Sequence, residues 1–203
     1  QDWAKAYQEN QITIIYDTMW NSTRRMAECI AEGLRETDPT LTVKLFNSAV
    51  DDKNDIVTEV FKSKAILVGS PTINYGFLFS IGGIMEMIRG LKFKNKKAAA
   101  FGSYGWSGEA VKQITALLQG AGLDVVNDGL RCQWNPDQAT QETCRQYGRD
   151  FAAAVNASEA KEDEVQTELG DYNNDEQIGK AAKEHFEDWE KDAREGVKGG
   201  YAG

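Results

Sequence analysis

The sequence has little of what metal and disulfide sites need. It contains three cysteines, Cys29, Cys132 and Cys144, and none of them forms a C-x-x-C pair. An odd number at such wide spacing supports neither a disulfide framework nor a tetrahedral zinc or iron site. The single histidine, His185, excludes a histidine-rich metal centre within this chain, so we assign no metal ligand. We interpret each cysteine as a small buried hydrophobic residue.

Long apolar runs and basic stripes are also missing. No run approaches the roughly 20 residues that a membrane span needs, and the first residues, "QDWAKAYQEN", lack the pattern of a signal peptide. We therefore expect a cytoplasmic protein without membrane contact. The net charge of -9 is uneven, because 156–203 has 14 acidic and 6 basic residues and so carries -8 of it. No stretch resembles a basic surface for nucleic acid.

The hydrophobic pattern predicts alternating strands and helices. Buried strands are expected at 12–16, 42–46, 65–70 and 97–103, with a weaker fifth at 123–134 in which Gly129 marks a bulge or turn. Helical spacing predicts helices at 22–37, 53–63, 78–90, 108–122 and 136–155. This alternation is typical of an α/β domain, in which helices cover both faces of a parallel sheet.

Composition divides the chain into three parts. Residues 1–155 are predicted to form the α/β domain. Residues 156–174 have almost no apolar content and are interpreted as an acidic, solvated linker. Within 175–203, Ile178, Phe186 and Trp189 lie at helical spacing, which predicts an amphipathic helix followed by a flexible tail.

Ligands of such a sheet bind beyond the carboxyl ends of the strands, so the loops after strands one, three and four are informative. The first, "DTMWNST" (17–23), is rich in hydroxyl groups and contains neither glycine nor lysine. Hydroxyls and the N–H groups of a helix N-terminus can hold a phosphate together. The absence of lysine gives no sign of triphosphate chemistry. The alternative is that Ser22 only caps the helix.

The other two loops, 70–76 and 103–109, contribute aromatic residues. Tyr75, Tyr104 and Trp106 are placed to stack on a planar ring, although packing in the core would also explain each of them. One phosphate loop and one aromatic clamp fit a mononucleotide. Because the G-x-G-x-x-G of dinucleotide folds is absent after the first strand, the pattern favours FMN over NAD or FAD.

These segments resemble a known family. "ITIIYDTMWNSTRRMAECIAEGL", "AILVGSPTINYG" and "AAAFGSYGWSGEAVKQITALLQGAG" are similar to the flavodoxin-like domain of flavodiiron proteins, also called A-type flavoproteins or the flavorubredoxin family. The resemblance covers roughly 1–155. It implies a flavodoxin-like, doubly wound, five-stranded parallel sheet in the order 2-1-3-4-5, here followed by a C-terminal helical extension.

The resemblance also implies which residues bind FMN. The phosphate would be held by the first loop, and the ring would lie between the second and third loops, with Trp106 as the main stacking residue. The implied FMN-binding residues are Thr18, Met19, Trp20, Asn21, Ser22, Thr23, Pro71, Thr72, Ile73, Asn74, Ser103, Tyr104, Gly105, Trp106, Ser107 and Gly108.

In this family FMN receives electrons from a rubredoxin or a flavin reductase. It passes them to a diiron centre, held by a β-lactamase-like domain, that reduces oxygen or nitric oxide. That domain is absent from this chain, so the resemblance implies an FMN-binding electron-transfer domain and no catalytic residue is assigned. Two alternatives stay open: a stand-alone flavin-dependent reductase, and an interaction module acting through the C-terminal helix. A homo-oligomer is a further open expectation.

Overall fold

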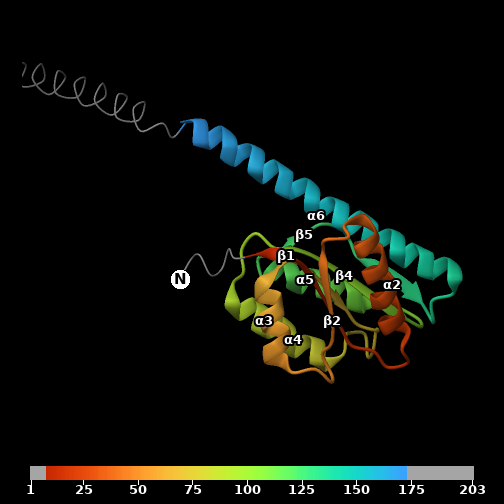
Figure 1. Cartoon of the computed structure of the whole chain (residues 1–203). Helices are drawn as coiled ribbons and strands as arrows, with labels where there is room; N and C mark the ends of the chain where they lie inside the picture. The colour runs from red at the N-terminus through yellow and green to blue at the C-terminus, as the bar shows by residue number, and fades with distance from the viewer. Residues whose placement is uncertain (1–7, 173–203) are drawn as a thin grey trace, which may run out of the picture. The chain divides into compact units, whose positions relative to one another are not determined.

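The computed structural model describes residues 8–172, with side chains as far as Ser158. The elements alternate along the chain as the sequence predicts (Figure 1). They are β1 (Glu9–Tyr16), α2 (Ser22–Thr37), β2 (Thr42–Asn47), α3 (Lys53–Lys62), β3 (Ser63–Gly69), α4 (Phe79–Leu91), β4 (Lys97–Tyr104), α5 (Glu109–Gly120), β5 (Asp124–Val125), β6 (Leu130–Gln133) and α6 (Gln138–Tyr172).

The described strands form one parallel sheet in the order β2-β1-β3-β4-β5, and β6 also pairs with β4. The predicted order 2-1-3-4-5 is therefore confirmed. β1 lies between β2 and β3, so Ile14 is opposite Leu45 on one side and Leu67 on the other. All seven residues of β3 are buried, as expected for a strand covered on both faces, whereas the edge strand β2 is half-exposed.

The fifth position of the sheet is divided between two short strands. β5 pairs with the start of β4 and β6 with its end, and the chain turns between them at Gly129, whose φ is 87°. A Cβ at this position would lie 2.4 Å from Val111 Cγ1, so a side chain is excluded by space as well as by conformation. The turn predicted at Gly129 is confirmed, and it carries β6 to the same edge of the sheet as Tyr104.

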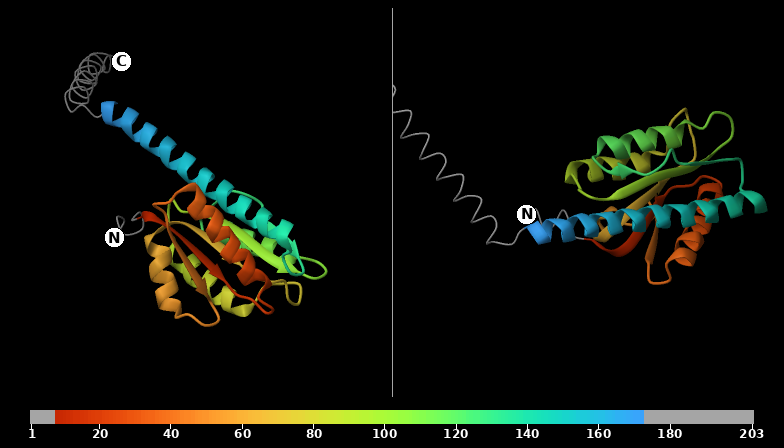
Figure 2. Two further views of the ribbon diagram at one scale, coloured as in Figure 1. Left: turned by 45° about the vertical axis from the view of Figure 1, so that its right-hand side comes forward. Right: turned by 90° about the horizontal axis from the view of Figure 1, so that it is seen from above.

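Helices cover both faces of the sheet (Figure 2). α2 and α6 pack on one face, with Ile30, Leu34 and Phe151 among the buried residues. α3, α4 and α5 pack on the other face, where Ile84 and Ile114 are fully buried. Each helix presents one apolar side to the sheet, which fixes the rotation of the helix and the direction of its N-terminus.

α6 is longer than the sequence predicts. It continues to Tyr172, through most of the stretch interpreted as a solvated linker at 156–174. Glutamate is the most frequent residue there, and glutamate, alanine, lysine, glutamine and leucine all have a high helix propensity, which favours continuation of the helix. The chain divides into two units, 1–156 and 157–203, and the amphipathic helix and tail predicted at 175–203 lie outside the described residues. No helix of the described part is both long and apolar enough to span a membrane.

All three cysteines are buried and none is in a disulfide. Burial raises the pKa of the Cys144 thiol to about 12, and it raises the pKa of the Cys29 and Cys132 thiols as well. Neutral, enclosed thiols are poor nucleophiles, which agrees with the interpretation of the cysteines as core residues. Among residues 8–158, no group of histidine, cysteine, aspartate or glutamate is arranged to hold a metal ion.

Lys96 is buried at the edge of the sheet opposite the carboxyl ends of the strands, next to the start of β4. Its side chain is 1% exposed, and Nζ donates hydrogen bonds to the carbonyl oxygens of Phe61, at 3.0 Å, and Ser63. Phe61 lies in the last turn of α3 and Ser63 is its C-cap residue, so Nζ lies at the helix end, where backbone acceptors lack helical partners. Burial nevertheless lowers the pKa of Lys96 from 10.5 to about 8.

This depressed pKa predicts a stability that rises with pH. Between about pH 8 and pH 10.5 the unfolded chain keeps a proton that the folded chain has lost. We expect the free energy of unfolding, relative to Lys96→Met, to increase by about 2 kcal/mol from about pH 7 to about pH 10. Urea denaturation of both proteins across this range measures the difference. A difference that stays flat with pH would contradict the prediction.

Candidate functional site

The loops after β1, β3 and β4 meet at the carboxyl edge of the sheet and enclose two adjoining cavities. The first has a volume of about 470 Å³ and the second about 440 Å³, and Met19, Thr72, Gly105 and Trp106 line both. The first is also lined by Trp20, Ser22, Pro71, Ser103, Tyr104, Trp134 and Asn135, and the second by Ile73, Asn74, Tyr75 and Ser107. This is the position at which doubly wound sheets bind ligands.

The N-terminus of α2 faces this edge without a side-chain cap. Asn21 occupies the N-cap position, but its side chain makes no capping hydrogen bond, and the first turn of α2 contains no acidic residue. α4 and α5, which follow the other two loops, also lack side-chain caps, whereas α3 is capped by Asp52. The unpaired N–H groups and the positive end of the α2 dipole are suited to an anion.

The hydroxyl groups of the first loop have different surroundings. Thr18 Oγ1 is buried and has no hydrogen-bond partner among the described residues. Ser22 Oγ donates to Asn135 Oδ1 at 3.1 Å, and Thr23 Oγ1 lies 2.9 Å from Ser103 Oγ in a fully buried contact. The Thr23–Ser103 contact connects the first and third loops, so these two residues support the site from the buried side. An unpaired buried hydroxyl is rare in folded proteins, and beside a ligand site a group of the ligand can satisfy it.

Asp17 fixes the start of the first loop. One carboxylate oxygen accepts the backbone N–H of Thr18 at 2.7 Å, and the other accepts the hydroxyl of Ser80. Ser48 Oγ in turn donates to Ser80 Oγ at 2.9 Å. The end of β1 is thereby joined to α4 and to the loop after β2, which sets the direction in which residues 18–22 leave the sheet.

Large aromatic side chains stand in the open part of the site. Trp20 is 82% exposed, Tyr75 75% and Trp106 88%. The second loop makes a tight turn in which Ile73 and Gly76 exchange backbone hydrogen bonds of 2.8 and 3.0 Å, which presents Tyr75 at the tip. Exposed aromatic faces around a concave site are suited to a flat, amphipathic ligand.

Backbone strain is concentrated around the cavities. Of the six non-glycine residues with positive φ in the described part, four lie in loops of the site: Asn21, Asn74, Tyr75 and Trp134. Asparagine tolerates this conformation, but tyrosine and tryptophan adopt it at a cost. Surrounding contacts must hold them there, which is common where loops are shaped for a ligand.

The structure brings most of the predicted residues together. Twelve of the sixteen line one or both cavities, and the other four, Thr18, Asn21, Thr23 and Gly108, lie at the bases of the loops. Their contacts with FMN remain predictions. Trp134 and Asn135 line the first cavity but were not predicted, because only the loops after strands one, three and four were considered. Their position directly after the fifth strand is the signal that could have identified them.

Comparison with known proteins agrees with this geometry. The model of the flavodoxin family matches residues 14–148. The chain is 51% identical over 150 residues to the anaerobic nitric oxide reductase flavorubredoxin of Escherichia coli O1:K1 / APEC, which covers 74% of this chain and 31% of that protein. The chain therefore spans about a third of the length of the curated relatives that it matches.

Solved structures show the same similarity. Rubredoxin oxygen:oxidoreductase from Desulfovibrio gigas superimposes with a TM-score of 0.72 at 35% identity, covering 77% of this chain and 38% of that one. The flavodiiron protein of Giardia intestinalis gives 0.72 at 28% identity, with 76% and 38% covered. A flavodoxin from the domain Archaea gives 0.64 at 28% identity, covering 72% of this chain and 99% of that one.

The cofactor follows from this similarity and from the site itself. Flavodoxin domains and their flavorubredoxin relatives bind FMN. The site fits this group, because an unpaired hydroxyl and an uncapped helix can bind its phosphate, and exposed aromatic faces can bind its ring. The chain belongs to the flavodoxin family and matches the FMN-binding module of flavodiiron proteins.

Proposed function

We propose that this chain is the electron-transfer module of a flavodiiron system. It would accept electrons from a rubredoxin or a flavin reductase and deliver them to a diiron domain on a separate segment or subunit. Bound FMN supplies the redox chemistry, and the protein supplies binding and orientation. A cytoplasmic location is part of this proposal.

One observation carries the proposal. The cavities are built from loops that join the uncapped N-terminus of α2 to exposed aromatic side chains, and the proposed electron transfer needs no acid, base or nucleophile between them. The similarity to flavorubredoxin and to rubredoxin oxygen:oxidoreductase supports the choice of partners, since the names of both proteins refer to rubredoxin. Oxygen and nitric oxide are both consistent final acceptors, because one relative is named for each.

Different residues of the site would bind the phosphate and the ring. The N–H groups at the start of α2, with Thr18 and Ser22, would bind the phosphate. The backbone of 72–74 and the indole of Trp106 would hold the two sides of the ring and exclude water from them. Because the aromatic side chains are exposed, one edge of the ring would stay close to solvent, where a protein partner can approach.

Titration with FMN tests the cofactor, and electron exchange tests the function. We expect one FMN per chain, with quenched flavin fluorescence and a visible spectrum altered from that of free FMN. After reduction, the FMN-loaded protein should pass electrons to oxidised rubredoxin in a stopped-flow experiment. A protein that leaves FMN fluorescence unchanged would refute the proposal at its first step.

The same preparation separates this function from a stand-alone reductase. An electron-transfer module alone should not oxidise NADH steadily, whereas an independent flavin-dependent reductase would. Steady NADH oxidation by the purified, FMN-loaded chain would therefore replace the proposed function by the alternative. The interaction module expected at 175–203 lies outside the described residues.

A further inference from the structure

A fourth loop, residues 133–135, begins at the last residue of β6, leads toward α6 and lies against the other three loops of the site. Trp134 and Asn135 line the first cavity together with residues of those three loops. The parallel pairing of Gln133 with Tyr104 brings this loop to the carboxyl edge of the sheet. It is therefore in place to contact the same ligand.

The loop is attached firmly to the third loop. The backbone N–H of Trp134 donates to Tyr104 O at 2.7 Å, and Gln133 Nε2 donates to Gly105 O at 3.1 Å. The indole of Trp134 covers Gly105, where a Cβ would lie 3.0 Å from the ring. These contacts explain why Trp134 keeps a φ of 59°, which is unusual for a residue with a large side chain.

Trp134 also contacts the main aromatic residue of the third loop. The ring centroids of Trp134 and Trp106 are 5.1 Å apart with an interplanar angle of 75°, which is an edge-to-face pair. Trp106 is 88% exposed, and Trp134 is its only aromatic contact among the described residues. The orientation of the Trp106 indole toward a bound ring thus depends on Trp134.

Asn135, the next residue, contacts the first loop instead. Its side-chain amide carries both an acceptor and a donor, and Oδ1 accepts the Ser22 hydroxyl at 3.1 Å. A phosphate needs the Ser22 proton for itself. If the amide presents Nδ2 instead, it donates to Ser22 Oγ and leaves that proton for the phosphate. A carboxylate at this position could only accept, and would compete with the phosphate.

We propose that residues 133–135 form a fourth FMN-binding loop, in which Trp134 positions Trp106 at the ring and Asn135 orients the Ser22 hydroxyl at the phosphate. This inference rests on the proposed binding of FMN and deepens it. It assigns two neighbouring residues to opposite ends of one ligand. Their substitution should therefore alter the affinities for FMN and for riboflavin, which lacks the phosphate, in different ways.

Fluorescence titration with both flavins tests the role of Trp134. We expect Trp134→Ala to lower the affinities for FMN and for riboflavin equally, by about 10-fold. The lost contacts concern the flavin ring, which both ligands share. Trp134→Phe should recover most of the affinity, since phenylalanine keeps an aromatic edge. Phe79→Ala is the matched control, because Phe79 is an exposed aromatic residue outside both cavities. It should leave both affinities unchanged.

The Asn135 variants test the phosphate end. Asn135→Asp should lower the affinity for FMN by about 10-fold or more, because a negative charge is added and a hydrogen-bond donor is lost at the phosphate. The affinity for riboflavin, which has no phosphate, should stay near that of the wild type. Asn135→Ala should have a smaller effect of the same kind. The ratio of the riboflavin dissociation constant to the FMN dissociation constant should therefore fall in the Asn135 variants and stay constant in Trp134→Ala.

Two controls distinguish a failure of this inference from a folding defect and from a failure of the proposed function. Urea denaturation without flavin should give nearly wild-type stability for Trp134→Phe and Asn135→Asp, so that their flavin affinities report on the site. If wild-type protein binds FMN and both Trp134→Ala and Asn135→Asp bind it equally well, the fourth loop is refuted and the proposed function stands. If the wild type does not bind FMN, the proposed function fails first.

Discussion

Replacing Gly148 by alanine should lower the free energy of unfolding by about 2–4 kcal/mol, although alanine is the better helix former. A Cβ at Gly148, in α6, would lie 2.3 Å from the carbonyl oxygen of Ile30 in α2. The contact is reciprocal, since a Cβ at Gly33 in α2 would lie 2.0 Å from the carbonyl oxygen of Arg145 in α6. Neither backbone can move without separating the two helices. Urea denaturation of Gly148→Ala and Gly33→Ala measures the loss.

Two other helical glycines provide the control. Gly83 and Gly90 lie in α4, and a Cβ at either position would meet no atom within 4 Å. Alanine there should stabilise the protein by about 0.5–1 kcal/mol through helix propensity alone. If Gly148→Ala is stabilising to the same extent as Gly83→Ala, the close contact between α2 and α6 does not exist.

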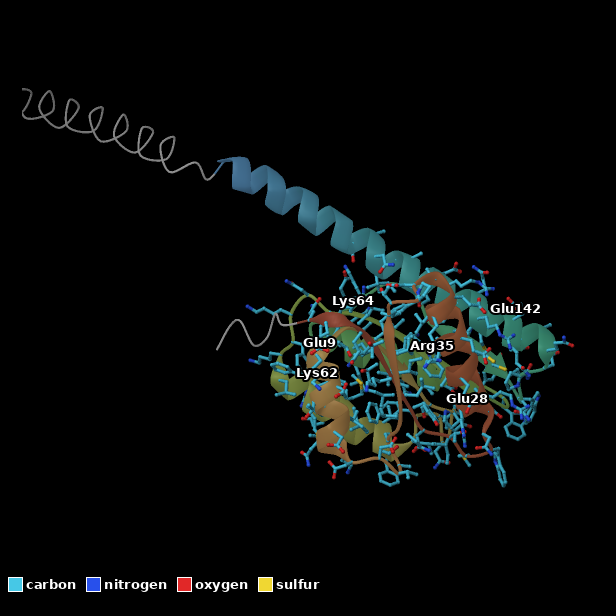
Figure 3. The ribbon with its side chains drawn as sticks, viewed as in Figure 1. Glu9, Glu28, Arg35, Lys62, Lys64 and Glu142 are labelled. Carbon is cyan, nitrogen blue, oxygen red and sulfur yellow. The ribbon has the colours of Figure 1, made fainter. Side chains whose placement is uncertain are left out.

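Ion pairs across the same interface should contribute less to the free energy of unfolding than the glycine contact does. Arg145 pairs with Glu32 at 2.7 Å, Arg149 pairs with Glu36 at 2.6 Å, and Glu142 contacts both arginines. Figure 3 shows Glu142 on α6, beside α2. All five side chains are partly or largely exposed, and exposed pairs are typically worth less than about 1 kcal/mol each. The glycine contact is therefore the main determinant of how closely the helices approach.

This contact also matters for the site. α2 begins at Ser22, beside the phosphate end of the cavity, and α6 follows directly after the fourth loop. Ser22 Oγ and Asn135 Oδ1, which lie before or at the start of these helices, are joined by a hydrogen bond of 3.1 Å. A side chain at Gly33 or Gly148 would separate the two helices and would therefore also act, from a distance, on the loops that precede them.

The sheet was predictable because its signal is local. The central strands are continuous apolar runs, and the residues that follow them are polar or aromatic, so the strands and three ligand loops can be read from short windows of sequence. The glycine contact could not be predicted this way. Gly33 and Gly148 each look like a weak point in a helix, and only the packing of α2 on α6 shows why a side chain is excluded.

The fourth loop and the length of α6 were missed for different reasons. β6 is only four residues long and follows the turn at Gly129, so the hydrophobic pattern gives little indication of the residues after it. The stretch after Asn156 is polar, and its polarity was interpreted as a linker although its glutamate, alanine, lysine and glutamine residues favour helix. The position of the fourth loop is determined by the pairing of β6 with β4, whereas the length of α6 is determined by local helix propensity.

Thr18→Val should separate binding from stability. The Thr18 hydroxyl is buried and unpaired in the described structure, so its removal should stabilise the flavin-free protein by up to about 1 kcal/mol. The same hydroxyl is predicted to donate to the phosphate of FMN. A hydrogen bond to a charged group contributes about 1.5–3 kcal/mol, so FMN affinity should fall by roughly 10- to 100-fold, while riboflavin affinity should change little.

Thr115→Val is the matched control for this variant. Thr115 lies in α5, outside both cavities, and its Oγ1 is the other buried hydroxyl oxygen without a partner in the described part. The substitution should stabilise the protein to a similar extent and leave FMN affinity unchanged. Urea denaturation and flavin titration of the two variants together decide the case. A Thr18→Val protein that is destabilised, or that binds FMN as tightly as the wild type, would show that the hydroxyl of Thr18 has a partner other than the phosphate. Loss of FMN affinity with a gain in stability would show that the sequence keeps an unsatisfied group in the flavin-free protein because the cofactor satisfies it.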